Sequence, residues 1–317
     1  MWKYAGIKQC NDYLLSLHLF NCKDEKRYIK TLYSISNNIE NNYNLYKIKK
    51  KHGGYRMIYE PNSMLLQIQK NILHNLLEDM NISSYAKAYI KGLSLRDNAK
   101  DHINKKVILK LDIKDFFESI SFMQIYNTCF SIVYYPKSVG MILTYLCSYD
   151  NHLPQGAPTS AYISNLVLRS FDENVGAWCL KHNISYSRYS DDMTFSGDFN
   201  PHDIIMFVKE NLKKLGLILN KNKIHIVYQS DMQSVTGIVV NKKLQVSKVY
   251  RQKIRQEMYY IKKYGLKSHL KNLGIKDEEK YVNSLFGKIN YVLQINSNDK
   301  EFQNYKNSFW KLIKVKV

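Results

Sequence analysis

The feature that most restricts the fold of this chain is a pair of adjacent aspartates inside a strand-forming stretch, SYSRYSDDMTFSGD. Asp191 and Asp192 separate two short runs of apolar and aromatic residues, which predicts a β-hairpin with the doublet at its turn. Two unpaired carboxylates on a buried hairpin would be costly without a cation, although a solvated turn is the plainer explanation of a doublet taken alone. The apolar and aromatic residues that flank it are Tyr186, Tyr189, Met193 and Phe195.

A third aspartate is predicted to lie beside this doublet. The run KVILKLD has the β-branched and aliphatic residues of a strand and ends on Asp112. A helix over 159–182, the doublet hairpin, a helix over 201–215 and the strands KIHIVY and SVTGIVVN follow. This β-α-β-β-α-β order predicts a sheet with both helices on one face, and Asp112 and the doublet can then share one edge.

Three carboxylates at one sheet edge are typical of a magnesium site. Mg²⁺ takes oxygen ligands and keeps several waters, so carboxylates and substrate phosphates suit it. Two such ions ~3.5 to 4 Å apart would clamp the attacking and leaving oxygens of a phosphoryl displacement. Because neighbouring strand residues point to opposite faces, Asp191 is predicted to be the direct ligand and Asp192 the more peripheral one.

The charge of the chain favours a polyanionic partner. Its 317 residues include 47 basic and 27 acidic side chains, a formal net charge of +20. Nucleic acid is therefore the leading class of partner, although an AT-rich coding sequence also favours lysine. A hydrophobic content of 45% excludes a disordered basic tail.

Cysteine usage and hydropathy indicate the compartment. The five cysteines are scattered and never form CxxC, so neither a disulfide framework nor a zinc site is predicted. No apolar run approaches the ~18 residues of a membrane span, and the N-terminal residues lack the pattern of a secretory leader. We expect a soluble, unprocessed protein without a membrane partner, in a reducing cytoplasm.

The remaining segments are predicted from their periodicity. Residues 1–46 resemble short surface helices of undefined role, and 46–61 form a basic hairpin around Gly53 and Gly54. An amphipathic helix is expected over 62–82 and a loop over 149–158. Residues 247–317 are predicted to be helical throughout, with 16 basic against 6 acidic side chains.

Taken in order, these segments resemble reverse transcriptases, and specifically the retron reverse transcriptases of bacteria, over roughly residues 46 to 295. LKLDIKDFFESI is similar to the first catalytic motif, LPQGAPTSAYISN to the nucleotide-facing loop and helix, and RYSDDMTFSG to the YxDD box, with Ser190 where alanine is more usual. An NAxxH element at 98–102 and a VTG triplet at 235–237 match elements that separate retron enzymes from other members.

The resemblance implies a role for each matching residue around the nucleotide. Asp112, Asp191 and Asp192 would be the catalytic, metal-binding triad. Phe117 matches the aromatic residue that floors the sugar pocket and leaves no room for a ribose 2′-OH; plain core packing is its alternative. Three further matches are Arg56, on the triphosphate, and Gln155 and Gly156, under the incoming nucleotide and the templating base.

A second group of residues is implied to contact RNA. Asn98 and His102 of the NAxxH element resemble residues tied to the partner RNA, whereas a histidine outside that context would be assigned no role. Thr236 is able to bond RNA, while Val235 and Gly237 have a strand and a tight turn as their alternative. The thumb segment KVYRQKIRQEMYYIKKYG interleaves lysine and arginine with tyrosine, a pattern that suits phosphates and unpaired bases but also an ordinary amphipathic helix.

The implied fold is α+β, the right hand of a polymerase, with fingers at 1–105, a palm of antiparallel sheet and helices on one face at 106–246, and a helical basic thumb at 247–317. The implied enzyme is an RNA-directed DNA polymerase that uses two Mg²⁺ ions and deoxynucleoside triphosphates (dNTPs). Retron resemblance adds a dedicated structured noncoding RNA as template, priming from the 2′-OH of an internal guanosine, and a branched RNA-linked DNA product (msDNA).

The same resemblance implies antiphage defence with a separate effector protein. Two alternatives stay open at this point. One is a reverse transcriptase of another lineage, such as a group II intron-like or diversity-generating enzyme. The other is a non-catalytic RNA-binding scaffold that retains the fold, which the complete set of carboxylates together with Gln155 disfavours.

Overall fold

The computed structural model describes residues 5–50 and 53–314, with the backbone alone for 310–314. The chain divides into two compact units, each described by itself. The first unit comprises the chain up to Gly92, Lys110–Thr194 and Asn200–His225; the second comprises Leu93–Leu109, Phe195–Phe199 and the chain from Ile226.

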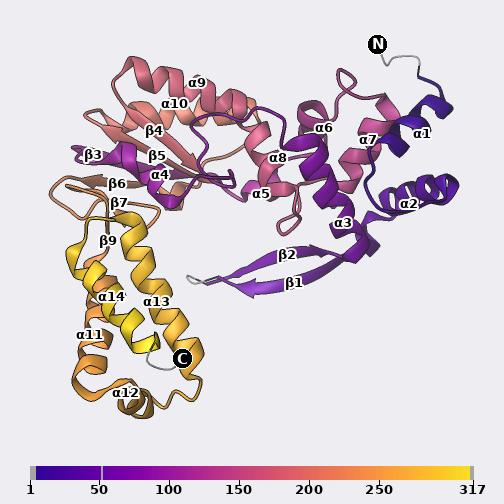
Figure 1. The fold of residues 1–317 in the computed structure, drawn as a ribbon. Coiled ribbons are helices and arrows are strands. Elements are labelled where there is room, and N and C mark those ends of the chain that lie inside the picture. The colour runs from indigo at the N-terminus through magenta and orange to yellow at the C-terminus, as the bar shows by residue number, and fades with distance from the viewer. Residues whose placement is uncertain (1–4, 51–52, 315–317) are drawn as a thin grey trace. The chain divides into compact units, whose positions relative to one another are not determined.

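The N-terminal part of the first unit combines helices with the predicted basic hairpin (Figure 1). Strands β1 (Tyr43–Lys49) and β2 (Tyr55–Pro61) pair antiparallel, with Tyr43 opposite Pro61 and Lys49 opposite Tyr55. Lys51 and His52, within the predicted turn, lie outside the described residues. The helices around the hairpin are α1 (Ile7–Ser16), α2 (Glu25–Asn37) and α3 (Ser63–Ile72).

The helix predicted over 62–82 is shorter than expected. Its α-helical part is α3, which Asn62 caps by accepting a hydrogen bond from the Leu65 amide at 2.9 Å. One π-helical turn, Leu73–Leu77, continues it and ends the regular structure five residues before the predicted end. The apolar periodicity alone does not predict the π turn. Leu77 lies on the buried side in the π turn, as it would in a continued α-helix.

A four-stranded sheet forms the centre of the chain and confirms the predicted β-α-β-β-α-β order. Its strand order is β4-β5-β3-β6. The hairpin of β4 (Ser185–Tyr189) and β5 (Asp192–Gly197) lies beside β3 (Val107–Asp112), and β6 (His225–Tyr228) is the last strand. Figure 1 shows α9 (Arg169–Lys181) and α10 (Pro201–Lys214) together on one side of this sheet.

Short helices connect β3 to the hairpin. They are α5 (Phe116–Ser119), α6 (Phe122–Cys129), α7 (Lys137–Leu146) and α8 (Ser160–Val167). The single helix predicted over 159–182 is therefore wrong, because the chain breaks at Leu168 into α8 and α9. Within α8 the Ser164 hydroxyl donates to the Ala161 carbonyl at 2.7 Å, a side-chain bond of the kind that bends helices.

The second unit contains a small sheet and the C-terminal helices. The segment SVTGIVVN does not extend the central sheet as predicted; it forms the hairpin of β7 (Ser234–Val235) and β8 (Ile238–Val239), which pairs with β9 (Gln245–Val246). Thr236 and Gly237 both have positive φ, 45° and 82°, so the chain reverses direction within the segment and cannot continue as one strand of the larger sheet. Four helices follow, namely α11 (Lys248–Tyr264), α12 (Leu266–Leu273), α13 (Glu278–Ile295) and α14 (Lys300–Lys314).

One apolar core joins the elements of the second unit. Ala99 of α4 (Leu95–Ala99), Val235 and Ile238 of the small sheet, and Ile254 and Ile289 of the long helices all belong to it. Removal of these apolar side chains from water supplies the main stabilising contribution to the unit. Among the residues described, no helix is both long and apolar enough to cross a bilayer.

Two glycines in helix interiors give a matched test of packing. A Cβ added at Gly140 in α7 would overlap the backbone carbonyl oxygen of Phe130, whereas one added at Gly287 in α13 would meet nothing within 4 Å. We expect Gly140→Ala to lower the free energy of unfolding by ~1–3 kcal/mol through overpacking. Gly287→Ala should raise it by ~0.5–1 kcal/mol, because alanine loses less backbone entropy. Urea unfolding measures both, and equal effects would contradict the close packing of α7.

Candidate active site

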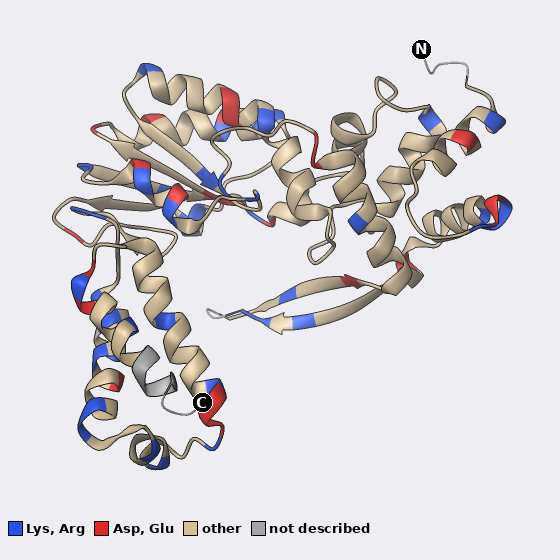
Figure 2. Cartoon of the chain, viewed as in Figure 1, with Lys and Arg blue, Asp and Glu red and all other residues tan. Residues whose placement is uncertain are grey.

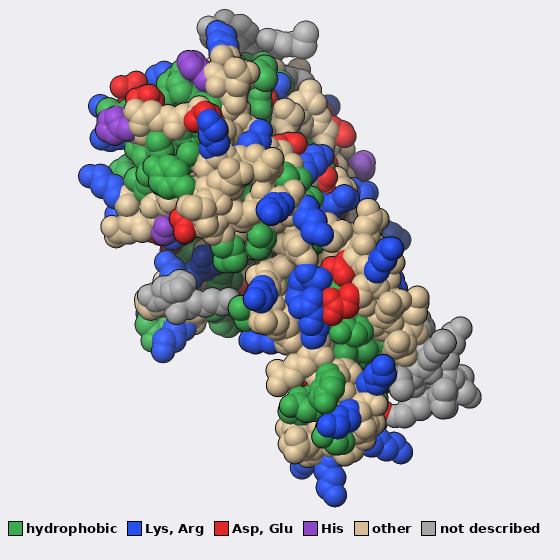
Figure 3. All heavy atoms as spheres, turned by 90° about the vertical axis from the view of Figure 1, so that its left-hand side faces the viewer, with side chains coloured by type: hydrophobic (Ala, Val, Ile, Leu, Met, Phe, Trp, Pro, Cys, Tyr) green, Lys and Arg blue, Asp and Glu red, His purple; other side chains and the backbone are tan. Residues whose placement is uncertain are grey.

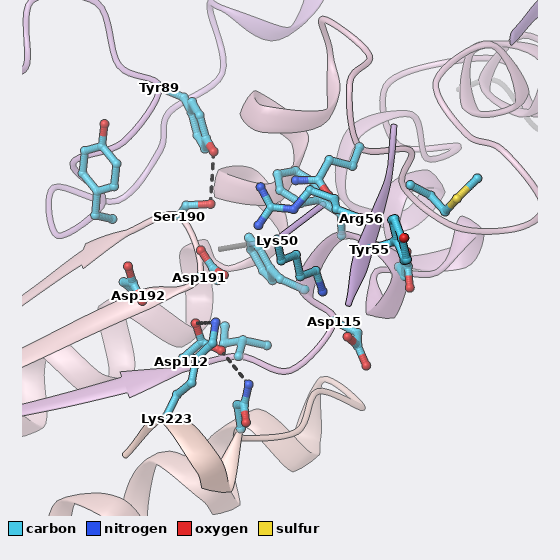
Figure 4. A pocket seen from close by; sticks show the side chains of 18 residues that line it. Lys50, Tyr55, Arg56, Tyr89, Asp112, Asp115, Ser190, Asp191, Asp192 and Lys223 are labelled. Carbon is cyan, nitrogen blue, oxygen red and sulfur yellow. Dashed lines mark hydrogen bonds and ion pairs between the residues drawn. The ribbon is translucent and has the colours of Figure 1, made fainter. Parts of the chain in front are cut away.

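The three predicted aspartates come together at the edge of the central sheet (Figure 4). One carboxylate oxygen from each of Asp112, Asp191 and Asp192 lies within 4.8 Å of the others. Asp112 is the last residue of β3, and the doublet lies at the β4–β5 turn, as the sequence pattern predicted. The Ile113 amide donates to the Asp191 carbonyl at 3.2 Å and so ties the turn to the end of β3.

The three carboxylates differ in exposure. Asp112 is buried, Asp191 is half-buried and Asp192 is exposed. That Asp191 is the direct ligand and Asp192 the more peripheral one stays a prediction from the sequence.

Asp112 has two partners that the sequence analysis missed. Lys223 Nζ lies 2.7 Å from Asp112 Oδ2, and the Asn220 side-chain amide donates to Asp112 Oδ1 at 3.1 Å. The Asn220 backbone amide also donates to the Asp112 carbonyl at 2.8 Å, which fixes the segment beside β3. Partial burial opposes protonation of Lys223, but its hydrogen bond to Asp112 and the surrounding carboxylates raise its pKa. The only sequence signal for Lys223 was its position in a lysine-rich stretch, KNK.

Burial and the charges of neighbouring carboxylates both raise the pKa values of Asp191 and Asp192. Burial and the charge of Asp112 raise the pKa of Asp191. Desolvation by the cavity wall, together with the charges of Asp191 and Asp112, raises the pKa of Asp192 to about 6. Lys223 supplies one positive charge against three carboxylates, so an ionised cluster keeps an excess of two negative charges. An oxygen-only donor set with that excess fits a hard divalent cation.

The carboxylates line a cavity of about 510 Å³. The predicted nucleotide-binding residues Arg56, Phe117 and Gln155 line the same cavity. In Figure 4, Arg56 and Lys50 lie on one side of it, and the three aspartates lie on the other. Arg56 comes from β2, and its positive charge acts to lower the pKa of Asp191. The cavity lining therefore carries the cations of Arg56 and Lys50 as well as the three aspartates, and Asp115 and Glu118 line it too.

Gly156 is not among the residues that line the cavity. Its φ of +123° belongs to the region that favours glycine, and a Cβ there would lie 2.8 Å from the Tyr59 carbonyl oxygen. The Tyr59 amide donates to the Gln155 carbonyl at 2.8 Å. Gly156 thus lets the β1–β2 hairpin approach the loop that carries Gln155.

The predicted RNA-contacting residues all lie in the second unit. Asn98, His102 and Val235 are no more than 1% exposed, whereas Thr236 is half-buried and Gly237 is exposed. Asn98 Nδ2 lies 3.4 Å from Thr236 Oγ1, which brings the NAxxH and VTG elements together. His102 Nδ1 lies 2.6 Å from Ser196 Oγ. Of the five residues, Thr236 and Gly237 reach the surface, whereas Asn98, His102 and Val235 are buried.

The raised pKa of Asp192 gives a test on the metal-free protein. Its folded-state pKa of about 6 exceeds the ~3.9 of an unfolded aspartate, so its ionisation costs stability as pH rises from ~4 to ~6, and the full cost remains above that range. We expect Asp192→Asn to stabilise the fold at pH 8 and to lose this advantage near pH 4. Because Asp192 is exposed, screening limits the gain to roughly 1 kcal/mol.

Thermal unfolding in EDTA between pH 4 and pH 8 measures this gain. The matched control is Asp198→Asn, at an exposed aspartate beyond β5 that pairs with Lys106. A gain for Asp192→Asn that does not change with pH would contradict the charge explanation.

Comparisons with known proteins identify the family. Residues 48–275 match the family model described as "Reverse transcriptase (RNA-dependent DNA polymerase)". The chain is 32% identical over 253 residues to the Retron Ec83 reverse transcriptase of Escherichia coli, covering 73% of this chain and 80% of that protein. It is 30% identical over 285 residues to the Retron Ec73 reverse transcriptase of Escherichia coli, covering 82% of this chain and 87% of that protein.

Solved structures agree with this assignment at the level of the fold. A foamy viral protease-reverse transcriptase in complex with double-stranded DNA superposes with a TM-score of 0.51 at 14% identity, over 86% of this chain and 39% of the viral chain. This likeness and the helix-rich α+β architecture confirm the right-hand polymerase fold. An enzyme of this kind depends on a divalent metal, which the three clustered carboxylates fit. With most of its length matched to the family, the chain belongs to the retron reverse transcriptases and is an RNA-directed DNA polymerase.

Proposed function

We propose that Asp112, Asp191 and Asp192 are the catalytic triad of this polymerase and hold two Mg²⁺ ions. The observation that carries the proposal is the cluster itself, three carboxylates within 4.8 Å against one lysine, in a cavity that Arg56 and Lys50 also line. Bound there, the ions would supply activation of the attacking hydroxyl and charge neutralisation at the departing pyrophosphate. The primer hydroxyl forms a new P–O bond to the α-phosphorus of a dNTP, and the bond from that phosphorus to the pyrophosphate breaks.

The cavity residues would bind and orient the nucleotide. Arg56 offers a planar guanidinium for bidentate bonds to the triphosphate, and Lys50 adds a second charge on the same side. Gln155 and Gly156 are proposed to lie under the incoming nucleotide and the templating base. The ring of Phe117 projects from α5 into the cavity, with its centroid 5.3 Å from that of the buried Phe116, and would exclude a ribose 2′-OH.

Residues 1–105, 106–246 and 247–317 are proposed as fingers, palm and thumb. The two compact units divide the chain differently, because the strands of the central sheet run through both. In Figure 2, blue segments of the ribbon mark Lys and Arg positions along α11 and α12. Lys263 lies over the rings of Tyr259 and Tyr264, both exposed, at 5.6 and 5.1 Å. Such cation–aromatic surfaces suit phosphates and unpaired bases, so we assign this helix to the template-primer.

The template is proposed to be a dedicated structured noncoding RNA, as in the retron relatives that the chain resembles. Priming from an internal guanosine 2′-OH would give a branched msDNA, in a cytoplasmic antiphage system with a separate effector protein. Thr236 and Gly237 are the exposed part of the proposed RNA-binding element, and Asn98, His102 and Val235 support them. On the face that Figure 3 presents, Lys and Arg side chains are spread widely rather than gathered in one stripe. Charge alone therefore does not single out an RNA path on that face.

Asp191→Asn tests the catalytic assignment. Its amide cannot replace an anionic metal ligand, so we expect DNA synthesis on a primed RNA template to fall by at least ~10³-fold, since one catalytic electrostatic contact alone is worth ~10²–10³. Asp198→Asn, at the other end of β5, should retain activity. A variant that unfolds is recognised by its thermal transition. Full synthesis by a folded Asp191→Asn protein would refute the triad.

The product distinguishes the retron proposal from general reverse transcription. The wild-type protein and Asp191→Asn are purified from the native locus, and the bound nucleic acid is treated separately with RNase, DNase and a debranching enzyme. We expect one short DNA joined through a debranchable linkage to one RNA, present only with the wild-type protein. Heterogeneous RNA without such a DNA, together with activity on any primed template, would contradict 2′-OH priming.

Phe117→Ala tests sugar selection. Removing the ring opens space where a 2′-OH would lie, so discrimination between dNTPs and ribonucleotides should fall by ~10- to 100-fold, the range for a steric pocket contact. The ratio of kcat/KM for the two nucleotide classes measures it, and Phe117→Tyr, which keeps the ring, is the control. Unchanged discrimination in Phe117→Ala would show that the ring packs without selecting the sugar.

A further inference from the structure

A fully buried arginine lies three residues before Asp191. Arg188, in β4, is 0% exposed, and so is its ion-pair partner Asp172 on α9. Arg188 Nε donates to Asp172 Oδ1 at 2.8 Å, and Nη2 donates to Oδ2 at 2.6 Å, a two-pronged contact. Tyr186 donates to Asp172 Oδ1 at 2.8 Å. Burial acts against ionisation of Arg188, but the charge and hydrogen bonds of Asp172, with the charges of Tyr186 and Asp191, together raise the pKa of the guanidinium.

Stability alone does not account for this pair. Replacing a buried ion pair by apolar residues of similar volume is often neutral or stabilising, because both charges lose their hydration. Apolar side chains cannot donate hydrogen bonds in fixed directions. Arg188 does so with its third guanidinium nitrogen, Nη1, which donates to the Ser190 carbonyl at 2.9 Å and to Asn165 Oδ1 at 3.1 Å.

The Ser190 carbonyl belongs to the peptide that precedes Asp191. Peptide bonds are planar, so fixing this carbonyl also fixes the amide and the Cα of Asp191. Ser190 has a φ of +62°, a left-handed conformation that costs a non-glycine residue of order 1 kcal/mol or more. Such a turn keeps its shape only where its surroundings hold it. The Arg188 contact acts from the buried side of the turn.

The same network holds the segment on the other side of Ser190. Asn165 Nδ2 donates to the Ala88 carbonyl at 2.9 Å, and the backbone of Arg188 pairs with Tyr85 and Lys87 at 2.9 and 2.8 Å. That segment leads to Tyr89, which lines the cavity and whose hydroxyl donates to Ser190 Oγ at 3.2 Å. Arg188 therefore holds the carbonyl of Ser190, and Tyr89 holds its hydroxyl. Arg188 and Asn165 in turn bind the segment that leads to Tyr89.

We infer that Arg188, oriented by Asp172, is a positioning residue that sets the direction of the Asp191 carboxylate toward the metal. The inference rests on the proposed role of Asp191 as a metal ligand. Arg188 is buried and lies outside the cavity lining, so it acts through the Ser190 peptide rather than on the substrate.

The test variant is the double substitution Arg188→Met with Asp172→Asn. It leaves no unpaired buried charge, and the amide that replaces the Asp172 carboxylate retains an acceptor for Tyr186, but the donor to Ser190 is lost. We expect the Mg²⁺ concentration for half-maximal DNA synthesis to rise ~10-fold, the size of outer-shell effects on metal sites. The kcat at saturating Mg²⁺ should fall by up to ~10²-fold, because a small misplacement of reacting groups has that cost.

Two measurements separate positioning from folding. The rise in unfolding temperature on adding Mg²⁺, measured without substrate, should shrink in the double variant, whereas its affinity for template-primer should stay within about twofold of wild type. Arg188→Lys keeps the positive charge but not the planar, two-pronged guanidinium, so its Mg²⁺ response should lie between those of the wild type and the double variant. It replaces the double variant in the test if that variant does not fold. The control is Val208→Ala, which removes buried side-chain volume from α10, a different element from β4 and α9 that carry the pair.

Each outcome is decisive. A folded double variant, or Arg188→Lys, with wild-type Mg²⁺ dependence overturns the inference. So does a loss of activity that Val208→Ala shares at equal loss of stability. Asp191→Asn, measured alongside, tells which idea has failed: if it retains synthesis, the triad itself is wrong, whereas if it is inactive while the Arg188 variants behave as wild type, the positioning role alone is wrong.

Discussion

The site depends on electrostatic repulsion among three carboxylates that the fold holds within 4.8 Å of one another. Without restraint, the repulsion would move the side chains apart or favour their protonation. Burial together with this repulsion raises the pKa values of Asp191 and Asp192. The surrounding structure opposes the separation of the side chains. Lys223 and Asn220 hold Asp112 at the end of β3, and the Ile113 amide ties the hairpin turn to the same strand.

Different residues carry the negative charge of the site and hold the backbone that positions it. The carboxylates that we propose as metal ligands line the cavity, whereas the groups that we infer to hold the hairpin turn lie in the interior, where water does not compete. The Arg188–Asp172 pair and Asn165 belong to the interior set and are fully buried. Directed donors in a buried network give the turn one conformation, which apolar packing alone does not specify.

The sequence predicted the parts of the site that depend on local pattern. Asp112 follows a clear run of strand residues, and the doublet interrupts another, so their meeting at one sheet edge follows from the order of elements. Lys223 and Asn220 were missed because nothing local distinguishes Lys223 from the many other lysines; only the tertiary contact with Asp112 selects it. The break at Leu168 escaped notice because apolar periodicity continues across it. Burial of Asn98 likewise depends on the β7–β8 hairpin, which is distant in sequence.

Preorganisation explains why so much buried polar structure surrounds a small turn. If the carboxylates had to be gathered from separate positions when a cation binds, their mutual repulsion and lost side-chain entropy would reduce the affinity, as ordering costs do for any ligand. Here the strained Ser190, the paired Arg188 and the Asp112–Lys223 contact hold the ligands in place beforehand. Lys223 also limits the repulsion until a cation arrives, because it already balances one of the three charges. A divalent ion bound as we propose would then add the charge that the protein lacks without having to build the geometry, so more of its interaction energy would be available to the reaction.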